Sequence, residues 1–199
     1  MARQKLEGLR VAILATDGFE QSELLEPRRA LDAAGAITEV VSPKPRQIKG
    51  WNHKEWGLEV DVDQKLDEAN PEVYDALVLP GGVMSPDALR MQPKAVAFVR
   101  SFFEADKPVA AICHGPWTVV ESGFAEDYRM TSWPSLRTDI QNAGGEWVDE
   151  EVVVDNNLVT SRNPGDLPAF NREMIGLFGT YYARRRPGTA ATHKSTSIT

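Results

Sequence analysis

Short, unbroken runs of apolar residues alternate along this chain with longer segments of helical periodicity. Because a continuous apolar run that ends at Gly, Pro or a turn is typical of a strand covered on both faces, these runs predict buried strands. The predicted strands are 9–15, 37–42, 74–79 and 109–113. Apolar residues spaced every three or four positions predict helices, and the main ones are 21–34, 94–105 and 166–182. This alternation favours a parallel sheet with helices on both faces.

Two parts of the chain depart from the alternation. Residues 43–63 are broken by Pro43, Pro45, Gly50 and Gly57, and we interpret them as an inserted hairpin. Three short strands, 146–148, 152–155 and 158–161, are expected to complete the main sheet. One domain is expected over 1–183, and the segment 184–199, which has no core pattern, is expected to be a flexible tail.

Composition and charge exclude several classes of protein. Acidic residues outnumber basic ones by 29 to 22 in the 199 residues, for a net charge of −7, which argues against a nucleic-acid partner. No apolar run approaches the roughly 20 residues of a membrane span, so no membrane partner is expected. A single Cys cannot form an intrachain disulfide, which favours the reducing cytoplasm.

The residue counts and motifs also limit which cofactors the protein is expected to bind. One Cys and three His make a structural zinc site improbable, so no metal is expected. The chain has no phosphate-binding loop and no dinucleotide fingerprint of the G-x-G-x-x-G type, so no nucleotide or flavin cofactor is expected either.

The strand at 109–113 ends in Cys113 and is followed at once by His114, Gly115 and Pro116. A strand that turns sharply into a helix at a nucleophilic residue has the geometry of a nucleophile elbow. A helix N-terminus and an adjacent imidazole both lower a thiol pKa, which favours the reactive thiolate. The alternative is a buried structural Cys, which is common for lone cysteines, but the position at the strand end favours the reactive interpretation.

Two further features lie where other strands end. Gly81 and Gly82 follow the strand at 74–79, and two glycines let the backbone N–H groups approach an anion, although a simple tight turn would also explain them. Glu20 precedes the helix at 21–34. It could complement the helix dipole or lie at the carboxyl edge of the sheet, where such folds place their sites.

Several motifs in order resemble one family. The segment A-I-C-H-G-P around Cys113 resembles the elbow of the PfpI-type intracellular proteases in the ThiJ/PfpI superfamily, which is related to the class I glutamine amidotransferases. Matching motifs are D-G-F-E-Q-S-E-L at 17–24, L-V-L-P-G-G at 77–82, T-S-W-P at 131–134 and V-T-S-R-N-P-G-D-L at 159–167. The resemblance covers about 9–182 and implies an α/β fold, a flavodoxin-like three-layer sandwich with a mostly parallel central sheet.

The resemblance also implies roles for individual residues. Cys113 would be the nucleophile and Glu20 the carboxylate that leans against its thiol. The backbone N–H groups of Gly82 and His114 would form an oxyanion hole. Asp87 of a neighbouring subunit would orient the base His114, although the family normally has Glu in this segment and the alignment needs a one-residue insertion here.

Other residues near these motifs complete the expected site. Gly81, Gly115 and Trp133 are expected on the substrate and oxyanion side. Glu23 is expected to face solvent or an interface.

Two reactions and one non-enzymatic role are compatible with these parts. The first is attack on a reactive carbonyl, as in glyoxalase or deglycase relatives, and the second is peptide hydrolysis through an acyl-enzyme. The third is a stress protein whose Cys113 is oxidised without turnover. The expected partners are a small carbonyl or peptide substrate and further copies of the chain, in a homodimer or hexamer with a shared active site. We favour a cytoplasmic, cysteine-dependent enzyme of carbonyl stress.

Overall fold

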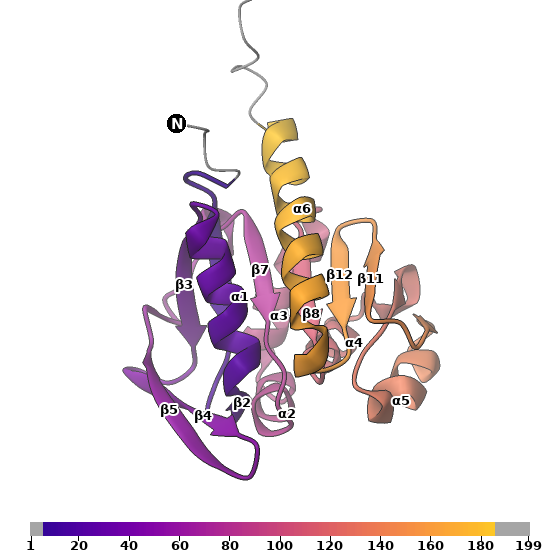
Figure 1. Cartoon of the computed structure of the whole chain (residues 1–199), viewed down its shortest axis with the longest axis horizontal. Coiled ribbons are helices and arrows are strands. Elements are labelled where there is room, and N and C mark those ends of the chain that lie inside the picture. Colours follow the sequence, from indigo (N-terminus) through magenta and orange to yellow (C-terminus); the bar gives the residue numbers. More distant parts are fainter. Residues whose placement is uncertain (1–5, 186–199) are drawn as a thin grey trace, which may run out of the picture.

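The computed structural model describes residues 6–185 as a three-layer α/β sandwich (Figure 1). Its main sheet has seven strands in the order β11-β12-β8-β7-β1-β3-β6. All neighbouring strands are parallel except β11, which is antiparallel to β12. The strands are β1 Arg10–Leu14, β3 Ile37–Ser42, β6 Gln64–Lys65, β7 Ala76–Leu79, β8 Val109–Ile112, β11 Val152–Asp155 and β12 Leu158–Ser161. The predicted fold class is confirmed.

Helices cover both faces of this sheet. In Figure 1, α1 and α6 cross the front of the sheet, and α3 lies behind it. The helices are α1 Gln21–Ala33, α2 Met84–Arg90, α3 Pro93–Glu104, α4 Pro116–Ser122, α5 Arg137–Asn142 and α6 Leu167–Arg185. Within the described residues, no helix is long and apolar enough to cross a membrane.

The alternation of side chains along each buried strand creates two cores. In β1, Val11 and Ile13 belong to the core under α1 and α6, whereas Ala12 and Leu14 belong to the core under α3 and α4. Such a strand is apolar on both faces because both faces are covered. This is why the sequence shows continuous apolar runs here instead of period-two alternation.

The inserted segment 43–63 forms the predicted hairpin. Its strands are β4 Gln47–Asn52 and β5 Glu55–Asp61, which pair antiparallel with an irregularity between Lys49 and Trp51. Together with β2 Phe19–Glu20 they form a separate three-stranded sheet. The hairpin therefore packs beside the start of α1 and near the carboxyl edge of the main sheet.

One strand was assigned to the wrong sheet, and the segment predicted as a tail begins inside a helix. The segment at 146–148 does not extend the main sheet: β10 Glu146–Trp147 pairs with β9 Arg129–Met130 in a two-stranded sheet. Strand β11 already occupies that edge of the main sheet, so β10 pairs with β9 instead. Helix α6 extends through Arg185, so residues 184 and 185 are helical, and the rest of the predicted tail lies outside the described residues.

Candidate active site

Cys113 lies between the end of β8 and the start of α4, in a backbone conformation that L-residues rarely adopt. Its φ angle is 61°, in the left-handed region that costs a non-glycine residue about 1–3 kcal/mol. Two hydrogen bonds hold it there: its N–H donates to the Ser161 carbonyl at 3.0 Å, and its carbonyl accepts from the Trp133 N–H at 2.9 Å. The predicted elbow is therefore present and fixed by two neighbouring segments.

Glycines make room for this elbow. A Cβ at Gly115 would lie 2.3 Å from the Leu79 carbonyl oxygen. A Cβ at Gly81 would lie 2.3 Å from Oε2 of Glu23 and 2.6 Å from Cβ of Cys113. Both contacts are far below van der Waals distance, so any larger residue would displace the backbone or separate the acid from the thiol.

The acid beside the thiol is Glu23, and the assignment of Glu20 to this position is corrected. Glu23 is completely buried, and its negative charge raises the pKa of the Cys113 thiol. Glu20 is only partly buried, and its side chain accepts a hydrogen bond from the Ser22 hydroxyl at 3.4 Å. Glu20 is the N-cap residue of α1 and precedes the first helical turn, whereas Glu23 lies on the buried side of that turn.

The carboxyl group of Glu23 has an unusual environment. Both of its oxygens are shielded from solvent and make no hydrogen bond of standard geometry within the described residues. Burial raises the pKa of Glu23 to about 8, and the Glu20 carboxylate contributes to the rise. The Cys113 thiol and the backbone N–H groups of Gly81 and Gly82 lower this pKa by a smaller amount. Glu23 is thus an acid that changes its charge near neutral pH.

The thiol of Cys113 is not acidified in the way the sequence suggested. Burial raises its pKa, and negative charge on Glu23 raises it further. Hydrogen bonding from the backbone N–H groups of Gly82 and His114 lowers it. Two adjacent negative charges in a buried site are unfavourable, so the pair carries at most one negative charge near neutral pH, and a proton must leave the thiol when it reacts.

The backbone N–H groups of Gly82 and His114 are thus the donors beside the thiol. Gly82 has a φ of +82°, and a Cβ there would lie 2.5 Å from the Gly18 carbonyl oxygen. The positive φ and the close approach both require glycine. Both N–H groups lie close enough to the sulfur to affect its pKa, and backbone donors in such a position can stabilise an oxygen formed by addition to a carbonyl.

His114 contacts the thiol directly. Its Nδ1 lies 3.2 Å from Cys113 Sγ, and its Nε2 lies 3.5 Å from the Ser135 hydroxyl. Its ring makes an edge contact with Trp117 at 5.1 Å between centroids and stacks on Trp133 at 6.0 Å. Burial lowers the pKa of His114, so the imidazole is neutral at pH 7 and can accept a proton.

Asp87 lies elsewhere in this single chain. It is an exposed residue of α2, and the structure gives it no hydrogen bond or ion pair with His114 among the described residues. The nitrogen that an orienting acid would bind, Nε2, faces the Ser135 hydroxyl instead. Within one chain, His114 is thus positioned by Ser135 and by two tryptophans.

Trp133, which stacks on His114, has 42% of its surface exposed. No group of three or more His, Cys, Asp or Glu in residues 6–185 could hold a metal ion. The site is built from a thiol, an acid, an imidazole and backbone donors.

The family model described as the DJ-1/PfpI family matches residues 9–177. The chain belongs to this family. It is 44% identical over 169 residues to "Deglycase TK1284" of Thermococcus kodakarensis, which covers 85% of this chain and 99% of the relative. It is 42% identical over 172 residues to "General stress protein 18" of Bacillus subtilis, which covers 85% of this chain and 98% of the relative.

Solved structures agree with this membership. The two-domain protein of Anabaena variabilis with DJ-1/ThiJ/PfpI-like and ferritin-like domains has a TM-score of 0.80 and 34% identity, covering 96% of this chain and 52% of that chain. The ThiJ/PfpI domain protein of Brachyspira murdochii has a TM-score of 0.79, covers 87% of this chain and 98% of that chain, and at 21% identity shows the shared fold alone.

Two residues of this DJ-1/PfpI site were missed in the sequence. Ser135 gave no signal, because it is a single hydroxyl in a short 3-10 helix, Pro134–Leu136, with apolar neighbours. Glu23 did give one: the buried positions Leu31 and Pro27 of α1 lie four residues apart, and the next position of that stripe is Glu23. An acid on the apolar stripe of a helix is a stronger indication of function than an acid at its N-cap.

Proposed function

We propose that this DJ-1/PfpI protein is a cysteine-dependent enzyme that acts on reactive carbonyls, with deglycase or glyoxalase activity in carbonyl stress. The observation that carries this proposal is the pairing of Cys113 with a buried acid, Glu23, in a left-handed elbow. The relatives named deglycases, including those of Thermococcus kodakarensis and Pyrococcus furiosus, and the relative named General stress protein 18 support it.

The geometry supports addition of the thiol to an aldehyde. As the bond from Cys113 Sγ to the carbonyl carbon forms, the thiol proton passes to the ionised carboxylate of Glu23. The π electrons of the carbonyl move onto its oxygen, where the N–H groups of Gly82 and His114 stabilise the charge. Because the pKa of Glu23 is raised to about 8, this base is matched to near-neutral pH.

An α-oxoaldehyde such as methylglyoxal then needs no external oxidant. In the hemithioacetal, a proton moves from the former aldehyde carbon to the adjacent carbon, so the first carbon is oxidised to a thioester while the ketone is reduced to an alcohol. Water hydrolyses the thioester, which releases a hydroxy acid and restores the thiol. Glu23 and His114 are the two groups near sulfur that can carry protons in these steps.

Peptide hydrolysis is the less favoured reaction. It requires a well-oriented base that protonates a leaving amine, and in one chain the free nitrogen of His114 meets the hydroxyl of Ser135 at 3.5 Å and no acid. The oxidation-sensor alternative uses the same thiol, and it predicts oxidation of Cys113 with no carbonyl turnover.

We further propose that the protein assembles as a homodimer or hexamer through α2, with Asp87 entering the site of a neighbouring copy. Val83 and Met84, at the start of α2 and close in sequence to Asp87, are exposed at 55% and 41%. Exposed apolar residues grouped beside a site are typical of an interface. The single Cys favours a cytoplasmic location.

The test compares wild type, Cys113→Ser and Asp87→Asn with methylglyoxal and with its adduct on N-acetylcysteine, alongside a fluorogenic peptide. We expect hydroxy acid to form in the wild type, no turnover with Cys113→Ser, and little peptide cleavage. A loss of activity in Asp87→Asn that a co-assembled wild-type subunit restores would support the shared site. Oxidation of Cys113 by peroxide without turnover of either carbonyl would overturn the enzymatic proposal.

A further inference from the structure

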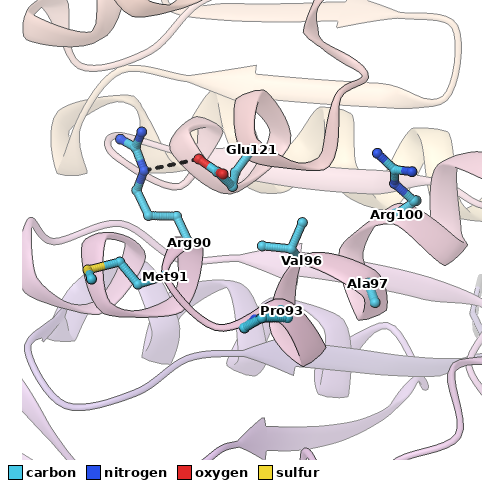
Figure 2. A pocket seen from close by; sticks show the side chains of 7 residues that line it. All are labelled: Arg90, Met91, Pro93, Val96, Ala97, Arg100 and Glu121. Carbon is cyan, nitrogen blue, oxygen red and sulfur yellow. Dashed lines mark ion pairs between the residues drawn. The ribbon is translucent and has the colours of Figure 1, made fainter.

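A hollow of about 670 Å³ lies between α2, α3 and α4, outside the active site (Figure 2). Its sides carry charge: Arg90 of α2 and Glu121 of α4 on one side and Arg100 of α3 on the other. Its floor is formed in part by the aliphatic side chains of Val96 and Ala97. The volume is in the range of small-molecule sites in proteins, which also combine apolar walls with a few charged groups.

The two arginines differ in their partners. Arg90 forms an ion pair with Glu121, with 3.4 Å between Nε and Oε2. Arg100 donates from Nε to the Ser122 carbonyl at 3.2 Å, and no carboxylate lies within ion-pair distance of it among the described residues. The terminal nitrogens of Arg100 therefore carry a positive charge that no side chain described by the structure neutralises.

The hollow is connected to the catalytic pair through one tryptophan. The guanidinium carbon of Arg90 lies 5.3 Å from the ring centroid of Trp117, and the same ring meets His114 at 5.1 Å. The indole N–H of Trp117 donates to Asp139 at 2.7 Å, which fixes its tilt. Movement of Arg90 would therefore remove one of the contacts that position Trp117 against His114.

We infer that this hollow binds a small organic anion and that the bound anion alters the environment of His114. Its carboxylate or phosphate pairs with Arg100, and its apolar body lies on Val96 and Ala97. The negative charge of the bound anion also attracts the guanidinium of Arg90 across the hollow and weakens its ion pair with Glu121. Arg90 then leaves its position over Trp117, and the change reaches His114 through the indole ring.

Binding is tested by calorimetric titration of the full-length protein with phenyl phosphate, and with benzyl alcohol as the neutral counterpart. We expect phenyl phosphate to bind and benzyl alcohol to bind at least about tenfold more weakly, because a hydrogen bond to a charged group is the stronger kind. Arg100→Gln should weaken phenyl phosphate binding at least about tenfold, and Arg100→Lys, which keeps the charge, should weaken it less.

The matched control is Arg172→Gln. Arg172 is an exposed arginine of α6 whose ion pair is with the neighbouring Glu173, and α6 covers the opposite face of the sheet. Its replacement should leave the affinity unchanged. Equal binding by wild type and Arg100→Gln, or equal binding of phosphate and alcohol, would overturn the site.

The connection to His114 is tested by the imidazole signals of His114 in ¹⁵N NMR spectra, assigned with His114→Gln. Saturating phenyl phosphate should shift these signals in the wild type. In Arg90→Lys, which keeps a positive charge but has no planar group to stack on Trp117, the anion should still bind and the shift should be lost. An unchanged His114 signal at saturation in the wild type would refute the connection. Neither measurement uses a carbonyl substrate, so the outcome is independent of the proposed reaction.

Discussion

Replacing Glu23 with Gln should make the protein more stable at pH 8 and should slow the reaction of its thiol. Glutamine has the shape of the protonated acid but cannot ionise, so it removes the cost of keeping a carboxyl group in a fully buried site. It also removes the base that accepts the thiol proton. Stability and reactivity therefore change in opposite directions, which a merely structural acid would not produce.

The magnitude follows from the pKa of Glu23, which burial raises from 4.5 to about 8. Each pH unit between these values corresponds to about 1.4 kcal/mol, so the total is at most about 5 kcal/mol. The sign is set by the raised folded-state pKa. Below pH 4.5 both states are protonated and nothing is lost. Between pH 4.5 and about 8, the unfolded chain ionises while the folded one does not, so the stability of the wild type falls as the pH rises.

The assay is urea unfolding of wild type and Glu23→Gln at pH 5 and pH 8. The stability difference should be below about 1 kcal/mol at pH 5 and should reach several kcal/mol at pH 8 in favour of the variant. The control is Glu26→Gln on the exposed side of the same helix, where Glu26 pairs with Arg29, and the change should stay within about 0.5 kcal/mol at both pH values. A Glu23→Gln difference that does not depend on pH would refute the reasoning.

Two further predictions concern a glycine beside the site and a buried lysine outside it. Gly81→Ala should reduce turnover at least about 100-fold and destabilise the fold by about 1–3 kcal/mol, because its Cβ would lie 2.3 Å from Oε2 of Glu23. The control is Gly176→Ala in α6, where a Cβ meets no atom within 4 Å, and this change should stabilise the fold by about 1 kcal/mol. Thermal melts and turnover assays compare the two variants. Lys107→Met should cost about 2–4 kcal/mol in urea unfolding, because the buried ammonium of Lys107 donates to three backbone carbonyl oxygens of the 71–74 turn; an unchanged midpoint would show that these bonds contribute nothing net.

The elbow could be predicted from sequence because its determinants are local. An apolar run of strand length, a small set of residues that stop it, and a proline that tolerates the first turn of a helix all lie within 109–117. The same holds for Gly82, whose positive φ only glycine adopts without cost. Both features depend on the conformation of a few consecutive residues, which the sequence specifies directly.

The acid was misplaced, because its position depends on which residues of the first helical turn face inward. Glu20 and Glu23 are three residues apart, and a helix rotates by about 300° over three residues, so both can face roughly the same side of the first turn. The start of α1 at Gln21 decides between them, since it leaves Glu20 outside the helix. The helix predicted from sequence also begins at residue 21, so its boundary was not the cause of the error. The N-cap acid was preferred although Glu23 lies on the buried stripe of Pro27 and Leu31.

The environment of Glu23 also bears on whether Cys113 is merely a core residue. A structural thiol needs only apolar neighbours, and a leucine or glutamine at position 23 would fill the same space without a buried acid. The chain instead combines a left-handed Cys113, an acid whose oxygens have no standard hydrogen bond within the described residues, and a glycine that brings the two together. Each of these features lowers stability, and all three lie at one end of the sheet. Unfavourable features grouped in this way are typical of a site whose chemistry requires them, and the two apolar cores on either side of the sheet supply the stability that such a site needs.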